Sequence, residues 1–147
     1  MEQNKSILIV DDEFGVRESL KMILKPIYLV HTASNGEEAL ECIQNEKIDL
    51  VTLDLKMPGL SGMEVLREIK KNHPFIEAII ITAYGSGENA MEATRYGVEF
   101  ITKPFNVPDI LISLNKSLEK QSYNLRLKNF NLYNSLVVKN SGRESIR

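Results

Sequence analysis

Three short, nearly uninterrupted apolar runs constrain the fold of this chain more than any other feature. They end near Val10, Leu53 and Ile81, and they consist mainly of Ile, Val and Leu. Strands buried on both faces have this composition, so the runs predict a parallel sheet with helices on both sides. Two weaker runs complete a set of five. The predicted strands cover residues 6–10, 28–33, 48–53, 76–81 and 98–101.

Helix start and stop signals lie between the strands. Asn35, Ser61 and Asn106 can each cap a helix, and Pro108 falls in a first turn, where a missing N–H costs nothing. Gly97 follows a helical pattern and fits a C-terminal cap. Strands and helices therefore alternate along the chain, which predicts an α/β, doubly wound fold.

The charge is unevenly distributed between two parts of the chain. Residues 1–115 hold 11 Lys and Arg against 18 Asp and Glu, whereas residues 116–147 hold 7 against 2. No strand pattern follows Leu114, but Leu125, Leu132 and Leu136 recur among Asn, Lys and Arg. We expect residues 121–147 to extend the last helix as a linker or a dimer contact. Their basic side chains favour a solvated helix face over direct nucleic-acid binding.

Several classes of protein are excluded or disfavoured by composition. No run approaches the ~18 apolar residues that a membrane span needs. The first residues lack the apolar segment of a signal peptide. A single cysteine, Cys42, excludes an internal disulfide. The simplest expectation is a protein of the reducing cytoplasm with no membrane partner.

Carboxylates follow two of the apolar runs directly. Asp11 and Asp12 come after the first run, and Asp54 comes after the third. In open α/β sheets the carboxyl ends of the strands form the binding crevice, so these three side chains should converge there. Carboxylates this close require a cation, and Mg²⁺ prefers such oxygen ligands. We expect Asp49, at the start of its strand, to be an ordinary solvated residue.

Thr82 and Lys103 end the fourth and fifth runs and point to the same crevice. A hydroxyl donor and an ammonium group are what a phosphoryl group on an aspartate would need. Glu13 is expected in the first turn of the first helix rather than on the metal. The residues thus indicate a metal site with a reactive aspartate that holds a phosphoryl group.

Together these segments resemble the receiver domain of bacterial two-component response regulators over residues 5–120. The spacing fits as well, with 28 residues from Asp54 to Thr82 and 21 from Thr82 to Lys103. The matching segments are Val10-Asp11-Asp12-Glu13, Asp54-Leu55-Lys56-Met57-Pro58-Gly59, Ile81-Thr82-Ala83 and Lys103-Pro104-Phe105. The resemblance implies a flavodoxin-like sheet of five parallel strands in the order 2-1-3-4-5, with an extended C-terminal helix.

The resemblance also implies a role for each site residue. Asp54 would be the phosphoryl acceptor. Asp12 and Asp54 would bind Mg²⁺ directly, together with the Lys56 backbone carbonyl, and Asp11 would act mainly through water. Lys103 would pair with the phosphoryl oxygens. The phosphodonor would be a sensor histidine kinase or a phosphotransfer protein.

A switch follows from the same resemblance. Thr82 would turn inward to the phosphoryl group and Phe100 would follow it, although Phe100 stands where the family more often has tyrosine. The surface of the fourth helix, fifth strand and fifth helix would then change and control an output domain or partner. A homodimer would form through that surface or through the C-terminal helix. The Lys103–Pro104 bond is expected to be cis.

Two other functions compete with a signalling switch. An aspartyl phosphatase of the haloacid dehalogenase type needs a second carboxylate two residues after the nucleophile, and this chain has Lys56 there. A receiver-like binding module without phosphorylation would not need all the site residues. We therefore expect self-phosphorylation and self-dephosphorylation but no turnover of a substrate. Lys56 and Tyr84 lie two residues after Asp54 and Thr82, and we expect them to shield the phosphoryl group from water.

The output is the least determined part of the function. No helix-turn-helix, ATPase or cyclase motif fits in residues 121–147. This tail resembles the linker that follows the receivers of enhancer-binding transcription activators, which suggests a role in transcription regulation.

Overall fold

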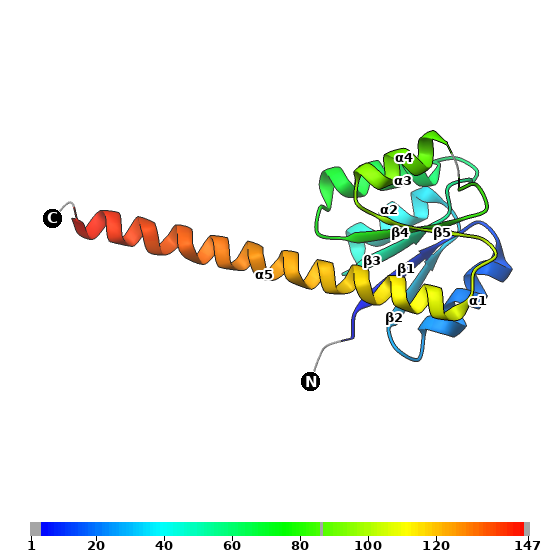
Figure 1. Cartoon of the computed structure of the whole chain (residues 1–147), viewed down its shortest axis with the longest axis horizontal. Helices are drawn as coiled ribbons and strands as arrows, with labels where there is room; N and C mark the ends of the chain where they lie inside the picture. Colours follow the sequence, from blue (N-terminus) through cyan, green and yellow to red (C-terminus); the bar gives the residue numbers. More distant parts are fainter. Residues whose placement is uncertain (1–3, 86, 146–147) are drawn as a thin grey trace.

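The computed structural model describes residues 4–85 and 87–145, with side chains as far as residue 139. Five parallel strands form one sheet in the order β2-β1-β3-β4-β5 (Figure 1). The strands are β1 (Ser6–Val10), β2 (Leu29–Ala33), β3 (Leu50–Leu53), β4 (Glu77–Thr82) and β5 (Glu99–Thr102). The helices are α1 (Phe14–Leu24), α2 (Gly36–Asn45), α3 (Gly62–Asn72), α4 (Glu88–Arg95) and α5 (Val107–Ser145). The predicted flavodoxin-like fold and strand order are confirmed, and each strand begins and ends within two residues of its prediction.

Helices cover both faces of the sheet, as the apolar runs predicted. Every residue of β1, β3 and β4 is buried, because these strands have neighbours on both sides and helices on both faces. On one face α1 and α5 pack against the sheet, and on the other face α2, α3 and α4 do so. The edge strands β2 and β5 are partly exposed. Their mixed composition follows from this position.

Local signals in the sequence set the helix ends. The Asn35 side chain accepts a hydrogen bond from the Glu38 N–H at 2.8 Å, and the Asn106 side chain accepts one from the Asp109 N–H at 2.9 Å. Ser61 begins α3 with a reciprocal capping box. Gly97, with φ of 71°, reverses the chain after α4 in a conformation that favours glycine. All four predicted signals are therefore confirmed.

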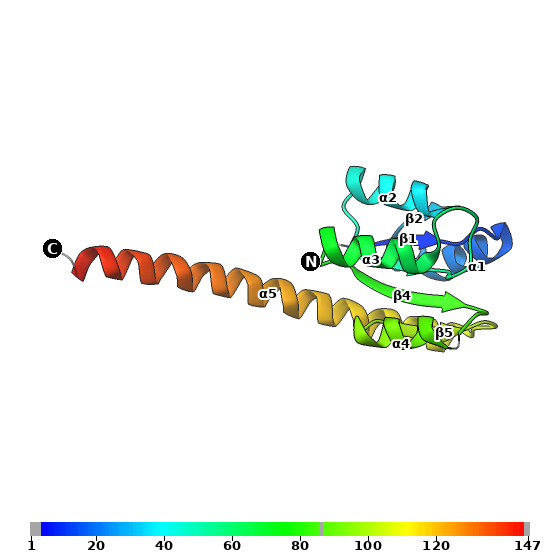
Figure 2. The ribbon, with the colours of Figure 1, turned by 90° about the horizontal axis from the view of Figure 1, so that it is seen from above.

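The last helix, α5, is a single helix of 39 residues. Its first part packs on the sheet, and the rest projects far beyond the globular part (Figures 1 and 2). The predicted extension of the C-terminal helix is confirmed. Within the described part of the chain, no helix combines the length and the apolar character that crossing a bilayer requires.

A buried polar contact fixes α5 where it leaves the sheet. Asp49 is only 4% exposed, and its carboxylate accepts hydrogen bonds from the Ser6 N–H at 2.8 Å and from Gln121 Nε2 at 3.0 Å. Gln121 Oε1 in turn accepts a hydrogen bond from Lys5 Nζ at 3.0 Å. The interpretation of Asp49 as a solvated residue is therefore wrong, because α5 covers this end of the sheet. The boundary expected between residues 120 and 121 falls inside this contact.

Candidate functional site

The pairing register brings the acidic residues together at the carboxyl end of the sheet. Val10 of β1 pairs with Leu53 of β3, so the residues that follow them, Asp11 and Asp54, leave the sheet side by side. The Asp54 N–H donates to the Val10 carbonyl at 3.1 Å, which continues the ladder up to the site. Asp11 and Asp54 are 2% and 4% exposed, whereas Asp12 is exposed. This edge between β1 and β3 is where the strand order reverses, the usual binding crevice of such a sheet.

Each carboxylate oxygen of Asp54 faces a different donor. The Thr82 hydroxyl, at the end of β4, donates to Asp54 Oδ1 at 2.7 Å. Lys103 Nζ, just after β5, lies 3.4 Å from Asp54 Oδ2. Thr82 pairs in register with Thr102, so Lys103 leaves the sheet beside it. Two neighbouring strands thus place a neutral and a charged donor on one buried carboxylate.

Three acidic side chains surround the Lys103 ammonium group. Its Nζ lies 2.8 Å from Asp11 Oδ2 and 3.8 Å from Glu13 Oε1, in addition to Asp54. Burial alone would lower the pKa of Lys103, but the hydrogen bond to Asp11 and the charges of Asp11 and Asp54 outweigh it and raise the pKa. Burial raises the pKa of Asp11, and its contacts with Lys103 and the Glu13 N–H offset only part of this effect. The site therefore holds a lysine stabilised in its charged form beside a buried Asp11 carboxyl whose charge is only partly compensated.

The loop after β3 is closed by a glycine. The Gly62 N–H donates to the Leu55 carbonyl at 2.9 Å, and Gly62 lies against the backbone of Asp54. A Cβ at this position would come within 2.8 Å of Leu55 Cα and would also collide with the Asp54 carbonyl oxygen. Only glycine lets α3 begin this close to the end of β3 and the Asp54 backbone.

Comparison with known proteins identifies the family. The family model of the response regulator receiver domain matches residues 7–115. The chain belongs to this family. It is a receiver domain of the two-component systems, and receivers interact with histidine kinases or other phosphodonors and generally bind Mg²⁺ at an acidic pocket.

The relatives of this receiver differ in overall length. Sporulation initiation phosphotransferase F of Bacillus subtilis (strain 168) is 38% identical over 121 residues, which make up 81% of this chain and 98% of that protein. Transcriptional regulatory protein GlrR of Escherichia coli (strain K12) is also 38% identical, over 118 residues, which make up 79% of this chain but 27% of that protein. The chain therefore spans about a quarter of the longer regulator.

A solved receiver has the same architecture. The crystal structure of a CheY-like response regulator receiver domain protein from Methanospirillum hungatei JF-1 superposes with a TM-score of 0.79 at 35% identity. The match covers 83% of this chain and 99% of that one. The relatives thus include proteins that consist of little more than the matched receiver and regulators that are several times longer.

The donor set of this receiver fits a hard divalent cation. Carboxylate oxygens of Asp11, Asp12, Glu13 and Asp54 lie within 4.8 Å of one another. A cluster of oxygen donors with both buried and exposed members suits Mg²⁺, which keeps several waters. Of the predicted ligands, the structure gathers the three aspartates. The role of the Lys56 backbone carbonyl as a metal ligand stays a prediction.

Two residues near the receiver site lie where the sequence analysis did not place them. Glu13 occupies the N-cap of α1 instead of its first turn, and its carboxylate lies close to those of the three aspartates. The expectation that Glu13 is not a metal ligand stays a prediction. Arg17, one turn into α1, donates from Nη1 to the Asp11 carbonyl at 2.7 Å and braces the start of the loop. Nothing in the spacing of the motifs indicated this contact.

The rim of the receiver site carries the predicted switch and shielding residues. Phe100 packs against the core, and its ring occupies the space beside Gly85 in the β4–α4 loop. Lys56 Nζ lies 4.8 Å from the centre of the Tyr84 ring, a cation–π contact across the mouth of the site. The Lys103–Pro104 bond is cis, as predicted.

Proposed function

We propose that this receiver accepts a phosphoryl group on Asp54 and acts as a phosphorylation-dependent switch. One observation carries the proposal: the buried Asp54 carboxylate has the Thr82 hydroxyl on one oxygen and the Lys103 ammonium near the other. A structural carboxylate would need no cluster of further acidic groups beside it. The arrangement instead suits a carboxylate that gains a doubly charged group.

In this mechanism a carboxylate oxygen of Asp54 attacks the phosphorus of a phosphohistidine. The new bond joins oxygen to phosphorus, the bond from phosphorus to the imidazole nitrogen breaks, and the imidazole leaves with the electron pair. Lys103 balances charge on the transferring group, and Thr82 can turn its hydroxyl from the carboxylate to a phosphoryl oxygen. Mg²⁺, held directly by Asp12, Asp54 and the Lys56 backbone carbonyl and through water by Asp11, would neutralise negative charge on the phosphoryl oxygens.

The same geometry supports the switch. Thr82 already bonds to Asp54, and its Oγ1 accepts a hydrogen bond from the Tyr84 N–H at 3.2 Å, so a movement of Thr82 would pull on the β4–α4 loop. The Phe100 ring lies beside Gly85 of the same loop. Without a hydroxyl, Phe100 can respond only by packing. The surface of α4, β5 and α5 would carry the change to an output domain or partner.

Acetyl phosphate with Mg²⁺ tests the proposal against its alternatives. We expect mass spectrometry to detect one phosphoryl addition, which disappears in Asp54→Asn and on removal of divalent metal with EDTA. Continuous phosphate release without accumulation of a phosphorylated protein would instead support an aspartyl phosphatase. No addition in the wild-type chain under any donor would leave a binding module.

A slow loss of the phosphoryl group is part of the proposal. Lys56 and Tyr84 contact each other at the rim, where they can hinder water. We expect the phosphorylated protein to persist for minutes or longer, and Tyr84→Ala to shorten that time. Complete loss within seconds in the wild-type chain would contradict the shielding role.

The partners follow from the same function. A sensor histidine kinase or phosphotransfer protein would supply the phosphoryl group, in the cytoplasm. The GlrR similarity favours an output in transcription regulation. A homodimer would use either the α4–β5–α5 surface or the projecting part of α5.

A further inference from the structure

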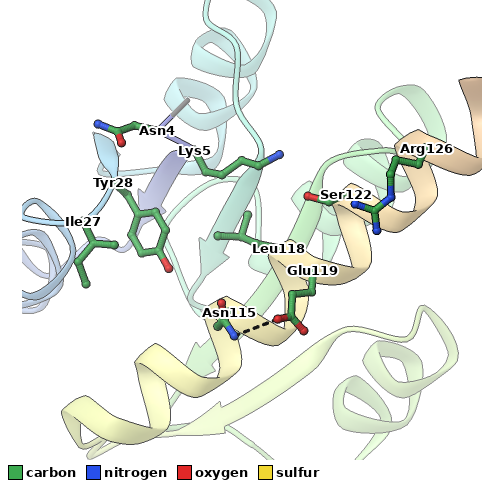
Figure 3. A pocket seen from close by; sticks show the side chains of 9 residues that line it. All are labelled: Asn4, Lys5, Ile27, Tyr28, Asn115, Leu118, Glu119, Ser122 and Arg126. Atoms are coloured by element: carbon green, nitrogen blue, oxygen red, sulfur yellow. Dashed lines mark hydrogen bonds between the residues drawn. The ribbon is translucent and has the colours of Figure 1, made fainter. Parts of the chain in front are cut away.

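A hollow of about 670 Å³ opens beside α5 where this helix leaves the sheet (Figure 3). Its walls come from three parts of the chain: the segment before β1, the turn before β2 and one face of α5. Pockets of about 300–1,000 Å³ suit small organic ligands. The lining includes Lys5, Tyr28, Leu118, Glu119, Ser122 and Arg126.

The hollow lies at the opposite end of the sheet from the phosphoryl site. Lys5 and Tyr28 come directly before β1 and β2, whereas Asp54 comes directly after β3. A strand of five residues such as β1 spans roughly 17 Å, so a small ligand in the hollow would not reach Asp54. The residues of the hollow therefore have no part in the phosphoryl transfer proposed above.

One end of the hollow is cationic. Ser122 and Arg126 are four residues apart and share a face of α5, and Lys5 Nζ is held at the level of Ser122 by its hydrogen bond to Gln121 Oε1 at 3.0 Å. Arg126 forms no ion pair with any described residue. An ammonium, a guanidinium and a hydroxyl donor together suit a carboxylate, which a guanidinium can bind through two hydrogen bonds.

The other end of the hollow is apolar apart from one carboxylate. Leu118 is only 7% exposed, and Tyr28 directs its ring and hydroxyl toward α5 (Figure 3). Glu119 Oε1 lies 3.4 Å from Asn115 Nδ2, so this carboxylate leans toward the start of α5 and away from Arg126. Positive charge and apolar surface are thus separated along the hollow.

We propose that the hollow binds a small amphipathic carboxylate. The carboxylate group lies between Lys5 and Arg126, where two charge-assisted contacts select an anion. The apolar body, such as an aromatic ring, packs against Tyr28 and Leu118 and gains from the removal of apolar surface from water. Glu119 would repel a second negative charge at the apolar end, so the ligand carries its charge at one end only.

Lys5 links this site to the contact that fixes α5. Its ammonium donates to Gln121 Oε1, and Gln121 Nε2 donates to the buried Asp49 carboxylate at 3.0 Å. A bound carboxylate would compete with Gln121 for Lys5, so binding in the hollow would alter the surroundings of Gln121. This inference goes beyond the proposed function and does not depend on phosphorylation of Asp54.

A matched pair of probes tests the site. Naphthoate carries a carboxylate on an apolar body, and naphthalenemethanol is a neutral molecule of similar size. In proton–nitrogen correlation NMR of the full chain, we expect naphthoate to shift the backbone amide signals of Lys5, Tyr28 and Ser122 in a saturable manner. The neutral probe should bind about tenfold more weakly or worse, because it cannot form the charge-assisted contacts.

Matched variants on the two flanks of α5 locate the site. Arg126→Gln should raise the Kd of naphthoate about tenfold. Lys128→Gln, at an exposed position on the opposite flank over the Phe75 ring, should leave Kd within about threefold. The proposal would be overturned by equal effects of the two variants, by equal affinity for the two probes, by shifts centred on Phe75, or by the absence of any saturable shift.

The side-chain amide of Gln121 reports the link to α5. Gln121 is 3% exposed and does not line the hollow, so a shift of its side-chain signal with the same Kd would show that Lys5 has changed partner. A Gln121 signal that stays constant at saturation would overturn the competition for Lys5. Phosphorylation of Asp54, followed by mass, should be unchanged in Arg126→Gln, so failure of this site is distinguishable from failure of the switch.

Discussion

Replacing Gln121 with methionine tests how firmly α5 is fixed to the receiver. Gln121 is 3% exposed and makes two hydrogen bonds, one to the buried Asp49 carboxylate and one from Lys5. Methionine keeps the length of the side chain, so the change removes polar contacts with little loss of volume. Asp49 would keep the Ser6 N–H as a partner but lose the Gln121 amide.

The expected cost follows from these contacts. A hydrogen bond to a charged group contributes about 1.5–3 kcal/mol, and the partly exposed Lys5 contact adds little. We therefore expect Gln121→Met to lower the free energy of unfolding by about 1.5–3 kcal/mol, which for a chain of this size lowers Tm by roughly 4–10 °C. Urea unfolding followed by circular dichroism would measure the change at constant m value.

Two controls sharpen this experiment. Asn129→Met changes an exposed side chain on the same helix and should leave stability within about 0.5 kcal/mol of wild type. Asp49→Asn should also destabilise, and the double variant should cost less than the two single changes together, because both remove one contact. A Gln121→Met protein with the wild-type midpoint would refute the argument that this buried contact holds α5.

Three further predictions concern the site and its supports. Lys103→Met should slow phosphorylation of Asp54 by acetyl phosphate about a hundredfold, measured by mass over time, and an unchanged rate would contradict its role. Gly62→Ala should lower the free energy of unfolding by about 1–3 kcal/mol and impair phosphorylation, because the added Cβ meets the Asp54 backbone. A variant with full phosphorylation and stability would show that the loop backbone can shift to accept the Cβ. Burial lowers the pKa of Lys70, so its charge opposes folding below the ordinary pKa. Lys70→Met should therefore raise the free energy of unfolding at pH 7, and this increase should shrink as pH rises toward about 10.5. Lys71→Met, measured in parallel unfolding curves, is the control. An increase that grows with pH would contradict the predicted direction.

The parts of the structure that the sequence predicted were those set by local patterns. Buried strands must be apolar, and parallel strands end at one edge, so the positions of Asp11, Asp54, Thr82 and Lys103 followed from where the runs stop. The helix caps at Asn35, Ser61 and Asn106 could also be predicted, because capping requires particular side chains within a few residues of the helix start.

The parts that the sequence missed depend on distant contacts. Asp49 is buried because Gln121, 72 residues later, donates to it, and no local pattern reports such a pairing. The direction of the Glu13 side chain depends on how α1 begins.

The continuity of α5 has a mechanical consequence. The same helix packs on the sheet next to β4 and β5 and then extends without interruption for some 24 residues beyond Gln121. At 1.5 Å per residue this arm is roughly 36 Å long, so a tilt of about 5° at its base displaces its tip by about 3 Å. A rearrangement at the base that is too small to alter the core would thus be amplified into a displacement of several ångströms at the far end of the arm.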